Sequence, residues 1–379
     1  MNLSWDVLVV GAGPAGALAA REAARGGSTV LLVDKAVFPR PKVCGCCLNS
    51  VALSTLEKAG LGELPGRLGA RPLEQIRLAA GGLQACIPLP SGRAVSREAF
   101  DHALVQEAVA SGACFLPGIE AGLGEIEKDG RWMQLKNPSD VLPVRVKARV
   151  VLAADGLGGR LLQREPALWI EADSRSRIGA GAIAEKGPDF YHSGTVFMAC
   201  GRGGYVGLVR LEDGRLDIAA AFDAPFLRSW GGPAKAAATV LEKAGFPPVD
   251  RLENLVWRGT PALTRRRARL SAQRLFVLGD SAGYVEPFTG EGIGWALASG
   301  LAVAPLALQG VKQWTPSLES LWEKRYCRLL AKRQRSCRLL TSLLRRTSWM
   351  RIAVAVLSRR PQFAASLVHY INMPLAVNG

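Results

Sequence analysis

Three glycines near the start of the chain, Gly11, Gly13 and Gly16, have the spacing Gly-x-Gly-x-x-Gly. An apolar run precedes them, and a helix-forming run opens at Pro14 and Ala15. Gly11 permits a tight turn, Gly13 lets the backbone approach a charged group, and Gly16 lets a helix pack closely on its strand. The start of that helix offers unpaired N–H groups and the positive end of its dipole. These residues predict a binding site for a dinucleotide pyrophosphate.

An acidic residue stands where the ribose of such a dinucleotide would lie. Asp34 follows Gly11 by 23 residues and ends a second apolar run, 30–33. A carboxylate at this offset accepts hydrogen bonds from ribose hydroxyls. We therefore assign Asp34 and its neighbour Lys35 to the binding of the cofactor.

Two later apolar runs also end at small or acidic residues. One leads into Asp155 and Gly156, and the other leads into Gly279 and Asp280. Because the carboxyl ends of parallel strands meet at one edge of a sheet, we expect these strand ends to converge on the ligand of the first motif.

A loop rich in proline and glycine follows the last of these strands. It contains Pro287, Gly290, Gly292 and Ile293. Its backbone can pass close to a flat ring, and its N–H groups can face the ring edge. A helix from about residue 290 would direct its positive N-terminal end at the same ring.

These motifs extend over residues 4–300. Over this range the chain resembles an FAD-dependent family that contains para-hydroxybenzoate-type hydroxylases, geranylgeranyl reductases and flavin halogenases. The resemblance implies FAD as the cofactor. It also implies an α/β fold, in which a Rossmann-like FAD-binding domain is interleaved with an antiparallel-sheet substrate domain and followed by C-terminal helices. By the same resemblance, Asp280 hydrogen-bonds the ribityl chain, Asp155 orients backbone and water near the flavin, and Arg97 lies near the FAD pyrophosphate.

The two domains are expected to alternate along the chain. Runs with strand character at 194–198, 204–211 and 216–222 predict the antiparallel sheet that walls the substrate chamber. The predicted boundaries are 1–70, 95–165 and 270–310 for the FAD-binding domain, 71–94 and 166–269 for the substrate domain, and 311–379 for a basic helical C-terminal region.

One loop contains Cys44, Gly45, Cys46 and Cys47. Its Cys-Gly pair resembles the loop beside the flavin in the geranylgeranyl reductase branch. Three interpretations stay open. In the first, a helix beginning near Ser50 lowers the pKa of Cys44 or Cys47 and so makes a reactive or proton-donating thiol. In the second, Cys44 and Cys47 cycle between thiols and a disulfide. In the third, all three thiols are structural and pack a tight turn. The first interpretation makes Cys44, Gly45 and Cys47 the catalytic candidates, and Cys44 is also a candidate for contact with the cofactor.

The reaction type follows only by elimination. The Tyr-x-Trp-x-Phe-Pro pattern of the resembling prenyl reductases is absent around residues 204–208, and no counterpart of the halogenase lysine is readable. We therefore favour a monooxygenase that uses NAD(P)H and O2 on an aromatic or lipid-like hydrophobic substrate. The alternative is a geranylgeranyl-reductase-like C=C reductase. A flavin halogenase and a basic nucleic-acid-binding protein rank below both.

No second Gly-x-Gly-x-x-Gly follows a strand, so NAD(P)H is expected to dock transiently against the flavin. Arg40 and Lys42 are candidate partners for its phosphates, and the alternative is that both are solvated loop cations. The three histidines have no metal-ligand spacing, and no metal site is expected.

The formal net charge of +16 is concentrated at the end of the chain. From residue 312 onward, thirteen Lys or Arg stand against two Glu, a balance of +11. Leucines recur at helical spacing between these cations, which predicts a basic amphipathic helix pair over 318–360. The pair either lies on an anionic membrane surface or packs on the flavin domain. The apolar run 349–357 is too short to span a bilayer.

Cell location and partners follow from the same reading. The first strand starts almost at Met1, and the eight cysteines have no disulfide-like spacing. We therefore expect a cytoplasmic protein, with peripheral membrane contact as the additional hypothesis. A hydrophobic small molecule is the expected partner, and no nucleic acid is expected because no stacking platform accompanies the cations.

Overall fold

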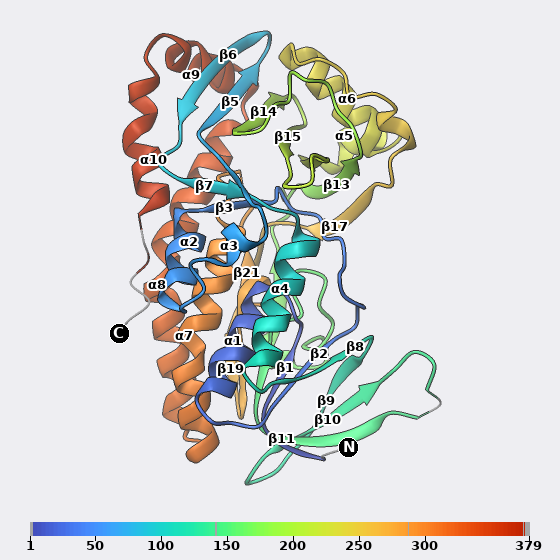
Figure 1. Cartoon of the computed structure of the whole chain (residues 1–379), viewed down its shortest axis with the longest axis vertical. Coiled ribbons are helices and arrows are strands. Elements are labelled where there is room, and N and C mark those ends of the chain that lie inside the picture. Colours follow the sequence, from blue (N-terminus) through green and yellow to red (C-terminus); the bar gives the residue numbers. More distant parts are fainter. Residues whose placement is uncertain (1–2, 141, 287, 374, 376–379) are drawn as a thin grey trace.

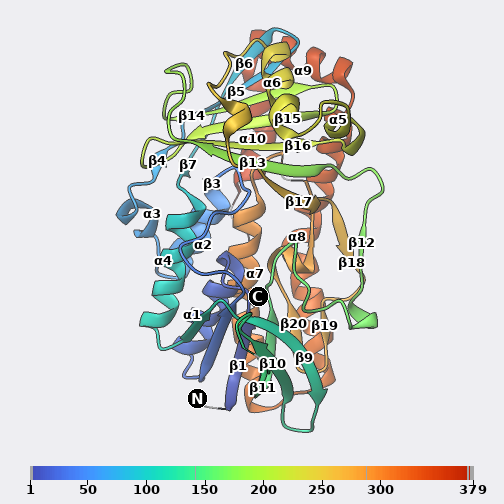
Figure 2. The same ribbon diagram turned by 90° about the vertical axis from the view of Figure 1, so that its right-hand side faces the viewer.

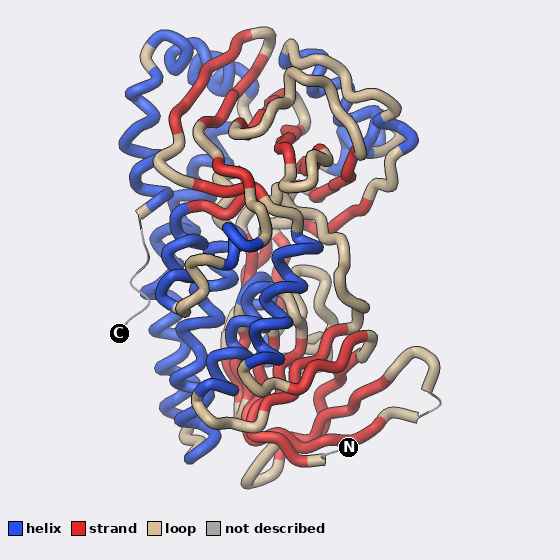
Figure 3. The backbone as a smooth tube through the Cα atoms, in the orientation of Figure 1, coloured by secondary structure: helices blue, strands red, loops and turns tan. Residues whose placement is uncertain are grey.

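The computed structural model describes residues 3–140, 142–286, 288–373 and 375. Two sheets stand one above the other in Figure 1, and the last helices run along one side of both. Figure 3 shows the same division, with the long helices gathered at one edge and the strands beside them.

The lower sheet is built on parallel strands whose residues are almost continuously apolar, as expected where both faces are covered. It runs in the order β19-β20-β11-β1-β2-β8, with the β9–β10 hairpin paired to β11. The bounds are β1 Ser4–Val10, β2 Val30–Asp34, β8 Cys114–Pro117, β9 Glu120–Ile126, β10 Arg131–Lys136, β11 Val144–Ala153, β19 Ser271–Ala272 and β20 Leu275–Val277. Strands β20, β11, β1, β2 and β8 are parallel to their neighbours in this run.

Three helices lie against this sheet: α1 (Pro14–Arg25), α4 (Arg97–Ala110) and α7 (Gly292–Lys312). Helix α7 packs on α1 so closely that a Cβ at Gly300 would lie 2.3 Å from the carbonyl oxygen of Ala15. By length and composition, α7 is the one helix of the described ranges that could cross a membrane. Its most apolar window is 72% buried, and the contacts with α1, α2 and α8 account for its apolar composition.

The upper sheet runs in the order β17-β13-β16-β15-β14-β5-β6 and is antiparallel except for the β14–β5 pair. Figure 2 shows it across the top of the molecule. The bounds are β5 Gln75–Ala80, β6 Leu83–Pro88, β13 Ile178–Ala184, β14 Thr195–Gly201, β15 Gly204–Arg210, β16 Leu216–Phe222 and β17 Arg258–Ala262. The three predicted strands are confirmed, with the first starting one residue later and ending three residues later than expected.

Each face of the upper sheet has a different cover. On one face, residues of β14 to β16 pack with α6 (Pro233–Ala244) in a cluster that includes Phe197 and Phe222. On the other, Leu78 and Met198 pack with Met350 of α9 (Thr347–Arg359). The second face is the one that borders the cavity described below.

Short strands join the two bodies. The bounds are β3 Cys47–Asn49, β4 Arg71–Pro72 and β7 Gly92–Ala94 in one three-stranded sheet, and β12 Ile170–Ala172, β18 Arg265–Arg267 and β21 Gly283–Tyr284 in another. The remaining short helices are α2 Ser50–Lys58, α3 Leu64–Arg67 and α5 Ala224–Ser229. Pairing of β3 with β7 fixes the end of the cysteine loop.

The C-terminal region consists of α8 (Pro316–Leu344), α9 and α10 (Ala365–Asn372), with a 3-10 turn at Pro361–Ala364. Helix α8 docks on the lower body through the buried Trp322, whose indole N–H donates to the carbonyl of Val277 at 3.0 Å. The expected apolar stripe is confirmed in part: Leu329 and Leu330 are buried, whereas Leu321 is 46% exposed. The predicted domain boundaries stay predictions.

Candidate functional site

A cavity of about 920 Å³ lies between the two sheets and the C-terminal helices. Its volume is at the upper end of the usual range for ligand pockets, about 300–1,000 Å³. The cavity wall contains most of the residues singled out from sequence: Gly13, Pro14, Ala15, Asp34, Lys35, Cys44, Gly45, Cys47, Arg97, Asp155, Gly156, Gly279, Asp280, Gly290, Gly292 and Ile293. The structure therefore brings the three strand ends to one cavity, although their individual roles stay predictions. Pro287 lies outside the described residues.

The glycines of the first motif divide into two kinds. A Cβ at Gly16 would lie 1.9 Å from the carbonyl oxygen of Gly11, and one at Gly11 would lie 2.2 Å from that of Ala154. These two positions need glycine because protein atoms fill the space. A Cβ at Gly13 would have Arg40 Nη2 at 3.7 Å as its nearest neighbour and would project toward the cavity. Gly13 therefore keeps space open for a ligand at the start of α1, where no side chain caps the helix.

Asp34 is held in place by the motif itself. Its Oδ2 accepts from the N–H of Ala12 at 2.8 Å, and its Oδ1 accepts from the N–H of Ala36 at 2.9 Å. The side chain lines the cavity next to Arg40, whose Nη2 is 3.9 Å from Asp34 Oδ2. A fixed carboxylate with remaining lone pairs fits the ribose hydroxyls of a dinucleotide.

Asp155 ties the second strand end to the third. Its Oδ1 accepts from Ser281 Oγ at 2.9 Å, and Ser281 Oγ accepts from the N–H of Gly156 at 2.7 Å. Its Oδ2 accepts from the N–H of Leu161 at 3.0 Å, which closes the turn after β11. Asp155 therefore orients backbone at the cavity wall.

Asp280 and Lys42 face the same part of the cavity with opposite charges. Burial raises the pKa of Asp280, and the charge of Lys42 opposes this shift. Burial lowers the pKa of Lys42, and the charge of Arg97 lowers it further. Lys42 and Arg40 both line the cavity, and whether they bind phosphates or are solvated cations stays open.

Arg97 starts α4, and its orientation is fixed by Asp101 one turn later. Ser96 caps the helix by accepting from the N–H of Ala99 at 3.1 Å. The guanidinium of Arg97 is 6% exposed and reaches both Asp101 and the Cys44 thiol. The neighbouring Arg40 Nη2 lies 3.5 Å from Asp101 Oδ2. Arg40 and Arg97 thus both share Asp101, and they bring two guanidinium groups to the cavity wall, where they can donate hydrogen bonds to a pyrophosphate.

The three thiols of the cysteine loop have different environments. A hydrogen bond from Cys46, followed by the charge of Arg97, lowers the pKa of Cys44 to about 5 against the opposing effect of burial. Burial raises the pKa of Cys47, whose Sγ donates to the carbonyl of Gly45 at 2.9 Å. All described cysteines are free thiols. The group that lowers the pKa of Cys44 most is thus Cys46. The start of α2 is capped instead by Asn49, which accepts from the N–H of Ala52 at 3.0 Å.

The half of the cavity away from α1 is apolar. Its wall is made by side chains of the upper sheet and by the last helices, namely Ile76, Leu78, Ile87, Val196, Met198, Tyr205, Leu340, Met350, Leu357, Phe363 and Val368. The rings of Tyr205 and Phe288 meet edge to face at 5.1 Å. Sequence analysis expected the antiparallel sheet to wall this chamber, and the structure agrees; it missed the part contributed by the C-terminal helices, because those residues lie far from the sheet in the chain.

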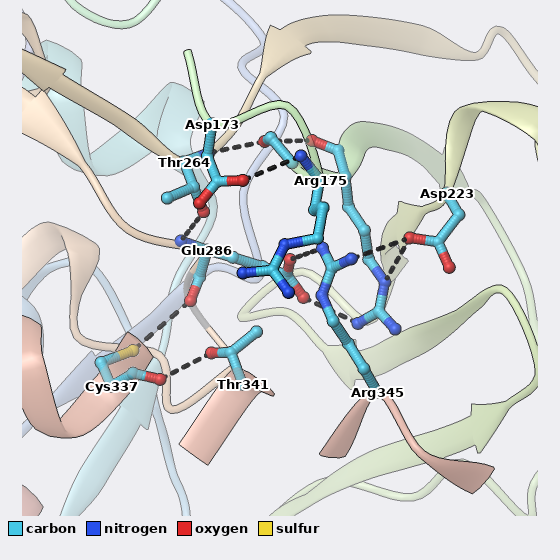
Figure 4. Close-up of polar contacts among 10 residues, drawn as sticks. Asp173, Arg175, Asp223, Thr264, Glu286, Cys337, Thr341 and Arg345 are labelled. Atoms are coloured by element: carbon cyan, nitrogen blue, oxygen red, sulfur yellow. Dashed lines mark hydrogen bonds and ion pairs between the residues drawn. The ribbon is translucent and has the colours of Figure 1, made fainter. Parts of the chain in front are cut away.

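A partly buried network of ion pairs attaches the C-terminal helices to the upper sheet (Figure 4). Glu286, 1% exposed, accepts from Arg177 Nη1 at 2.8 Å, and its other oxygen lies 3.6 Å from Arg345 Nη2. Arg345 Nη1 is also 3.5 Å from Asp223 Oδ1. Burial raises the pKa of Glu286 and the charge of Arg177 opposes the shift. Arg345 lies between α8 and α9, so this network holds the helix that closes the cavity.

Among the described residues, no group of three or more His, Cys, Asp or Glu is placed to hold a metal ion. The polar half of the cavity instead fits a dinucleotide: an open helix start with glycine at Gly13, a fixed carboxylate at Asp34 and cations at Arg40 and Arg97. The N-terminus of α7 reaches the same cavity through Gly292 and Ile293.

Comparisons with known proteins agree with this site. The family described as "FAD binding domain" matches residues 4–199. The chain is 29% identical over 397 aligned residues to the menaquinone reductase of Mycobacterium tuberculosis, with 94% of this chain and 91% of the relative covered. It is 26% identical to digeranylgeranylglycerophospholipid reductase 3 of Methanosphaera stadtmanae, with 84% and 81% covered.

The fold is also that of solved flavoproteins. The halogenase PltM, in complex with phloroglucinol and FAD, superposes with a TM-score of 0.75 at 17% identity and covers 97% of this chain and 83% of its own. The relatives similar in sequence are named reductases, so the preference for a monooxygenase over a C=C reductase is not supported. The chain belongs to the FAD-binding-domain family and is an FAD-dependent oxidoreductase.

Proposed function

We propose that this protein is a flavin-dependent reductase that saturates carbon–carbon double bonds of a long isoprenoid chain. The observation that carries the proposal is the continuity of the cavity: one space contains the dinucleotide-binding residues and extends along an apolar wall to α9 and α10. A flexible hydrocarbon chain fits such a space, because its burial is favourable wherever apolar side chains replace water. The two relatives, a digeranylgeranylglycerophospholipid reductase and a menaquinone reductase, are named for isoprenoid substrates and support the same substrate class.

When bound, the reduced FAD supplies the hydride, which is the cofactor's own chemistry. The residues of the chain bind and orient. The start of α1 at Gly13 faces the pyrophosphate, Asp34 faces the ribose, and the N-terminus of α7 favours negative charge at the ring. The apolar wall excludes water from the reacting carbons. Cys44, which lines the cavity beside Arg97, is the thiol placed to transfer a proton in the second step of the reduction, and its lowered pKa means that it must first receive that proton.

We also propose that NAD(P)H is the transient electron donor. The support is the positive charge of Arg40 and Lys42 on the cavity wall, which suits the phosphates of a second nucleotide. Lys35, at the end of β2, adds to this charge.

A peripheral membrane location on the cytoplasmic side is part of the same proposal. Helix α9 carries Trp349, Ile352 and Val356 on one face, and they are 55%, 55% and 43% exposed. The opposite face contains Met350 and Leu357, which line the cavity. An apolar face on a basic helix fits an anionic bilayer, from which an isoprenoid lipid would enter.

The test is an anaerobic turnover assay with a polyprenyl lipid and dithionite or NADPH as reductant. A reductase adds two hydrogen atoms per double bond without O2, as read by mass spectrometry. The fully saturated lipid is the matched control and should leave the flavin reduced. A monooxygenase, the competing function with the same cavity, would need O2 and add an oxygen atom. That product, with no anaerobic turnover, would overturn the proposal.

A further inference from the structure

One ion pair at the start of α7 has no part in the site described so far. Glu291 comes directly before the first residue of α7 and is 2% exposed, and Arg333 of α8 is 7% exposed. Arg333 Nη1 lies 3.4 Å from Glu291 Oε1, and Glu291 Oε2 accepts from Thr289 Oγ1 at 2.9 Å. A buried ion pair on its own is weak evidence for stability, because the cost of removing two charges from water offsets their attraction. The position of this pair therefore points to a role other than holding the fold.

The backbone on both sides of Glu291 borders the cavity, whereas its carboxylate is directed at α8. Gly290, Gly292 and Ile293 line the cavity. The side chain of Glu291 makes no capping hydrogen bond to the first turn of α7, and its two oxygens interact with the two partners named above. The first turn of α7 thus presents its main chain to the cavity, with a carboxylate directly behind it.

The charge of this carboxylate matters for a ligand at the start of α7. The N-terminus of a helix carries about half a positive charge. A carboxylate at the same end would cancel much of the attraction that this partial charge exerts on an anion in the cavity. Arg333 offsets the charge of Glu291, because a guanidinium does not lose its proton in proteins. Burial raises the pKa of Glu291, and the hydrogen bond from Thr289 and the charge of Arg333 oppose this shift.

Arg333 is held in place by the C-terminal helices. Its Nη2 donates to the carbonyl of Met373, and its guanidinium carbon lies 4.9 Å from the centre of the Tyr370 ring of α10. Cys337, one turn later on α8, places its Sγ 3.6 Å from Thr289 Oγ1. The charge at the start of α7 is thus balanced by a residue that comes from the end of the chain.

We propose that Arg333 is a positioning residue that raises the preference of the cavity for reduced over oxidised FAD, because it neutralises Glu291 at the start of α7. Reduction adds negative charge to the flavin ring, and a positive helix start stabilises that charge. For the place of the ring at α7 the inference rests on the proposed function, but it does not depend on the isoprenoid substrate. No electron and no proton passes through either residue.

Four variants separate the two charges from the shape of the pair. Glu291→Gln removes the negative charge, keeps an oxygen for Thr289 and leaves Arg333 uncompensated. Arg333→Gln leaves Glu291 as the charged member. The double variant removes both charges, and Arg333→Lys keeps the positive charge on a different side chain.

Arg345→Gln is the matched control, because Arg345 also lies in the C-terminal region and also pairs with a buried glutamate. Its Nη2 is 3.6 Å from Glu286 Oε2. Glu286 keeps a second partner in Arg177, whose Nη1 is 2.8 Å from Glu286 Oε1, and it does not adjoin the first turn of α7. The control should therefore leave the flavin as it is in the wild type.

The measurement is the midpoint potential of bound FAD, followed by absorbance during stepwise reduction without any lipid. The potential reports the ratio of the affinities for reduced and oxidised FAD. We expect Glu291→Gln to increase this ratio and Arg333→Gln to decrease it, each by about 2- to 30-fold, the range of a charge at a helix end. A tenfold change corresponds to about 30 mV for a two-electron couple. The double variant, Arg333→Lys and Arg345→Gln should stay close to the wild type.

The order of the two single variants decides the outcome. A higher potential in Glu291→Gln than in Arg333→Gln supports the inference. Equal potentials, or the reverse order, would overturn it, since a pair that only stabilises the fold would lower both melting temperatures without separating the potentials. If Arg333→Gln does not fold, Glu291→Gln is compared with the wild type, and an unchanged or lower potential overturns the inference.

This test stays separate from the proposed function, because no isoprenoid is present. If the wild type fails to reduce a polyprenyl lipid, the order of the potentials still decides the role of Arg333. Conversely, a wild type that reduces the lipid, with equal potentials in the two single variants, would keep the proposed function and remove this role of Arg333.

Discussion

The guanidinium of Arg97 and the carboxylate of Asp101 meet in two hydrogen bonds, 2.8 Å from Nε to Oδ1 and 2.7 Å from Nη2 to Oδ2. The residues are one turn apart on α4, and they are 6% and 0% exposed. Removal of one member of a buried ion pair leaves the other as an uncompensated charge, which costs about 3–5 kcal/mol.

We therefore predict that Asp101→Asn strongly destabilises the protein and weakens FAD binding, because it releases the arginine nearest to the cysteine loop. Urea unfolding of the apoprotein and FAD titration measure the two effects. Glu107→Gln is the control on the same helix α4. It removes the ion-pair partner of Arg67 of α3, whose side chain is 59% exposed, and should change stability by about 0–1 kcal/mol. Equal losses in the two variants would contradict the prediction.

The two glycines of the first motif should respond differently to alanine. A Cβ at Gly13 enters the cavity, so Gly13→Ala should keep the melting temperature of the apoprotein but lower FAD affinity by about tenfold or more. A Cβ at Gly16 meets a main-chain oxygen at 1.9 Å, so Gly16→Ala should destabilise the apoprotein itself by about 1–3 kcal/mol. Thermal melts and quenching of FAD fluorescence distinguish them. A Gly13→Ala variant with normal FAD affinity would place the pyrophosphate elsewhere.

The stability of the apoprotein should depend on pH through Cys44. An unperturbed thiol has a pKa of about 8.5, whereas the pKa of Cys44 is lowered to about 5, first by the Cys46 hydrogen bond. A lowered pKa contributes stability that is complete above the unfolded value and is lost as the pH falls through the folded value.

The difference in melting temperature between the wild type and Cys44→Ser is therefore predicted to grow from about pH 5 to about pH 8.5. The pKa of Asp217 is raised, so this acid makes stability fall as the pH rises. Its effect makes the predicted increase smaller, and the increase itself still comes from Cys44. Cys86→Ser, which removes an exposed thiol, controls for the loss of sulfur. Parallel curves for the wild type and Cys44→Ser at all pH values would show that Cys44 does not titrate in this range.

Some residues of the site could be predicted from sequence because the backbone conformation of a short segment allows only one or two residue types there. Gly16 is required by its contact with Gly11 within one strand, turn and helix, Gly11 has a positive φ of 103° in the turn, and Asp34 stands at a fixed offset from them. Such constraints act over a few residues, so they remain readable without the fold. The antiparallel strands of the upper sheet were predicted for the same reason, from short apolar runs bounded by turn residues.

The residues that sequence reasoning missed are selected by tertiary packing. Asp217 stands between Leu216 and Ile218, and an acid alternating with apolar residues is typical of a strand with one face in water. Here both faces of the sheet are covered, and the acid is buried. Likewise, the missing tryptophan pattern near Tyr205 says little about the shape of the cavity, because its wall is completed by α9 and α10 from the other end of the chain.

The final prediction concerns the exposed apolar face of α9. Trp349 and Ile352 are both 55% exposed, and the exposed cations Arg351 and Arg359 lie on the same helix. Apolar insertion and attraction to anionic headgroups should together bind this helix to an anionic bilayer. The wild type should therefore sediment with vesicles that contain anionic lipid, less with neutral vesicles, and less again at high salt, because added ions screen the attraction.

The double variant Trp349→Ser, Ile352→Ser should lose this binding while keeping the melting temperature, because neither side chain is part of the core. Trp169→Ser is the matched control: that tryptophan is 53% exposed but lies next to β12, on a different part of the molecule. If the control loses vesicle binding as much as the double variant does, the binding is not specific to α9. If the wild type stays in solution with anionic vesicles at low salt, the lipid must reach the cavity without docking of this helix, and the α9 face has another partner.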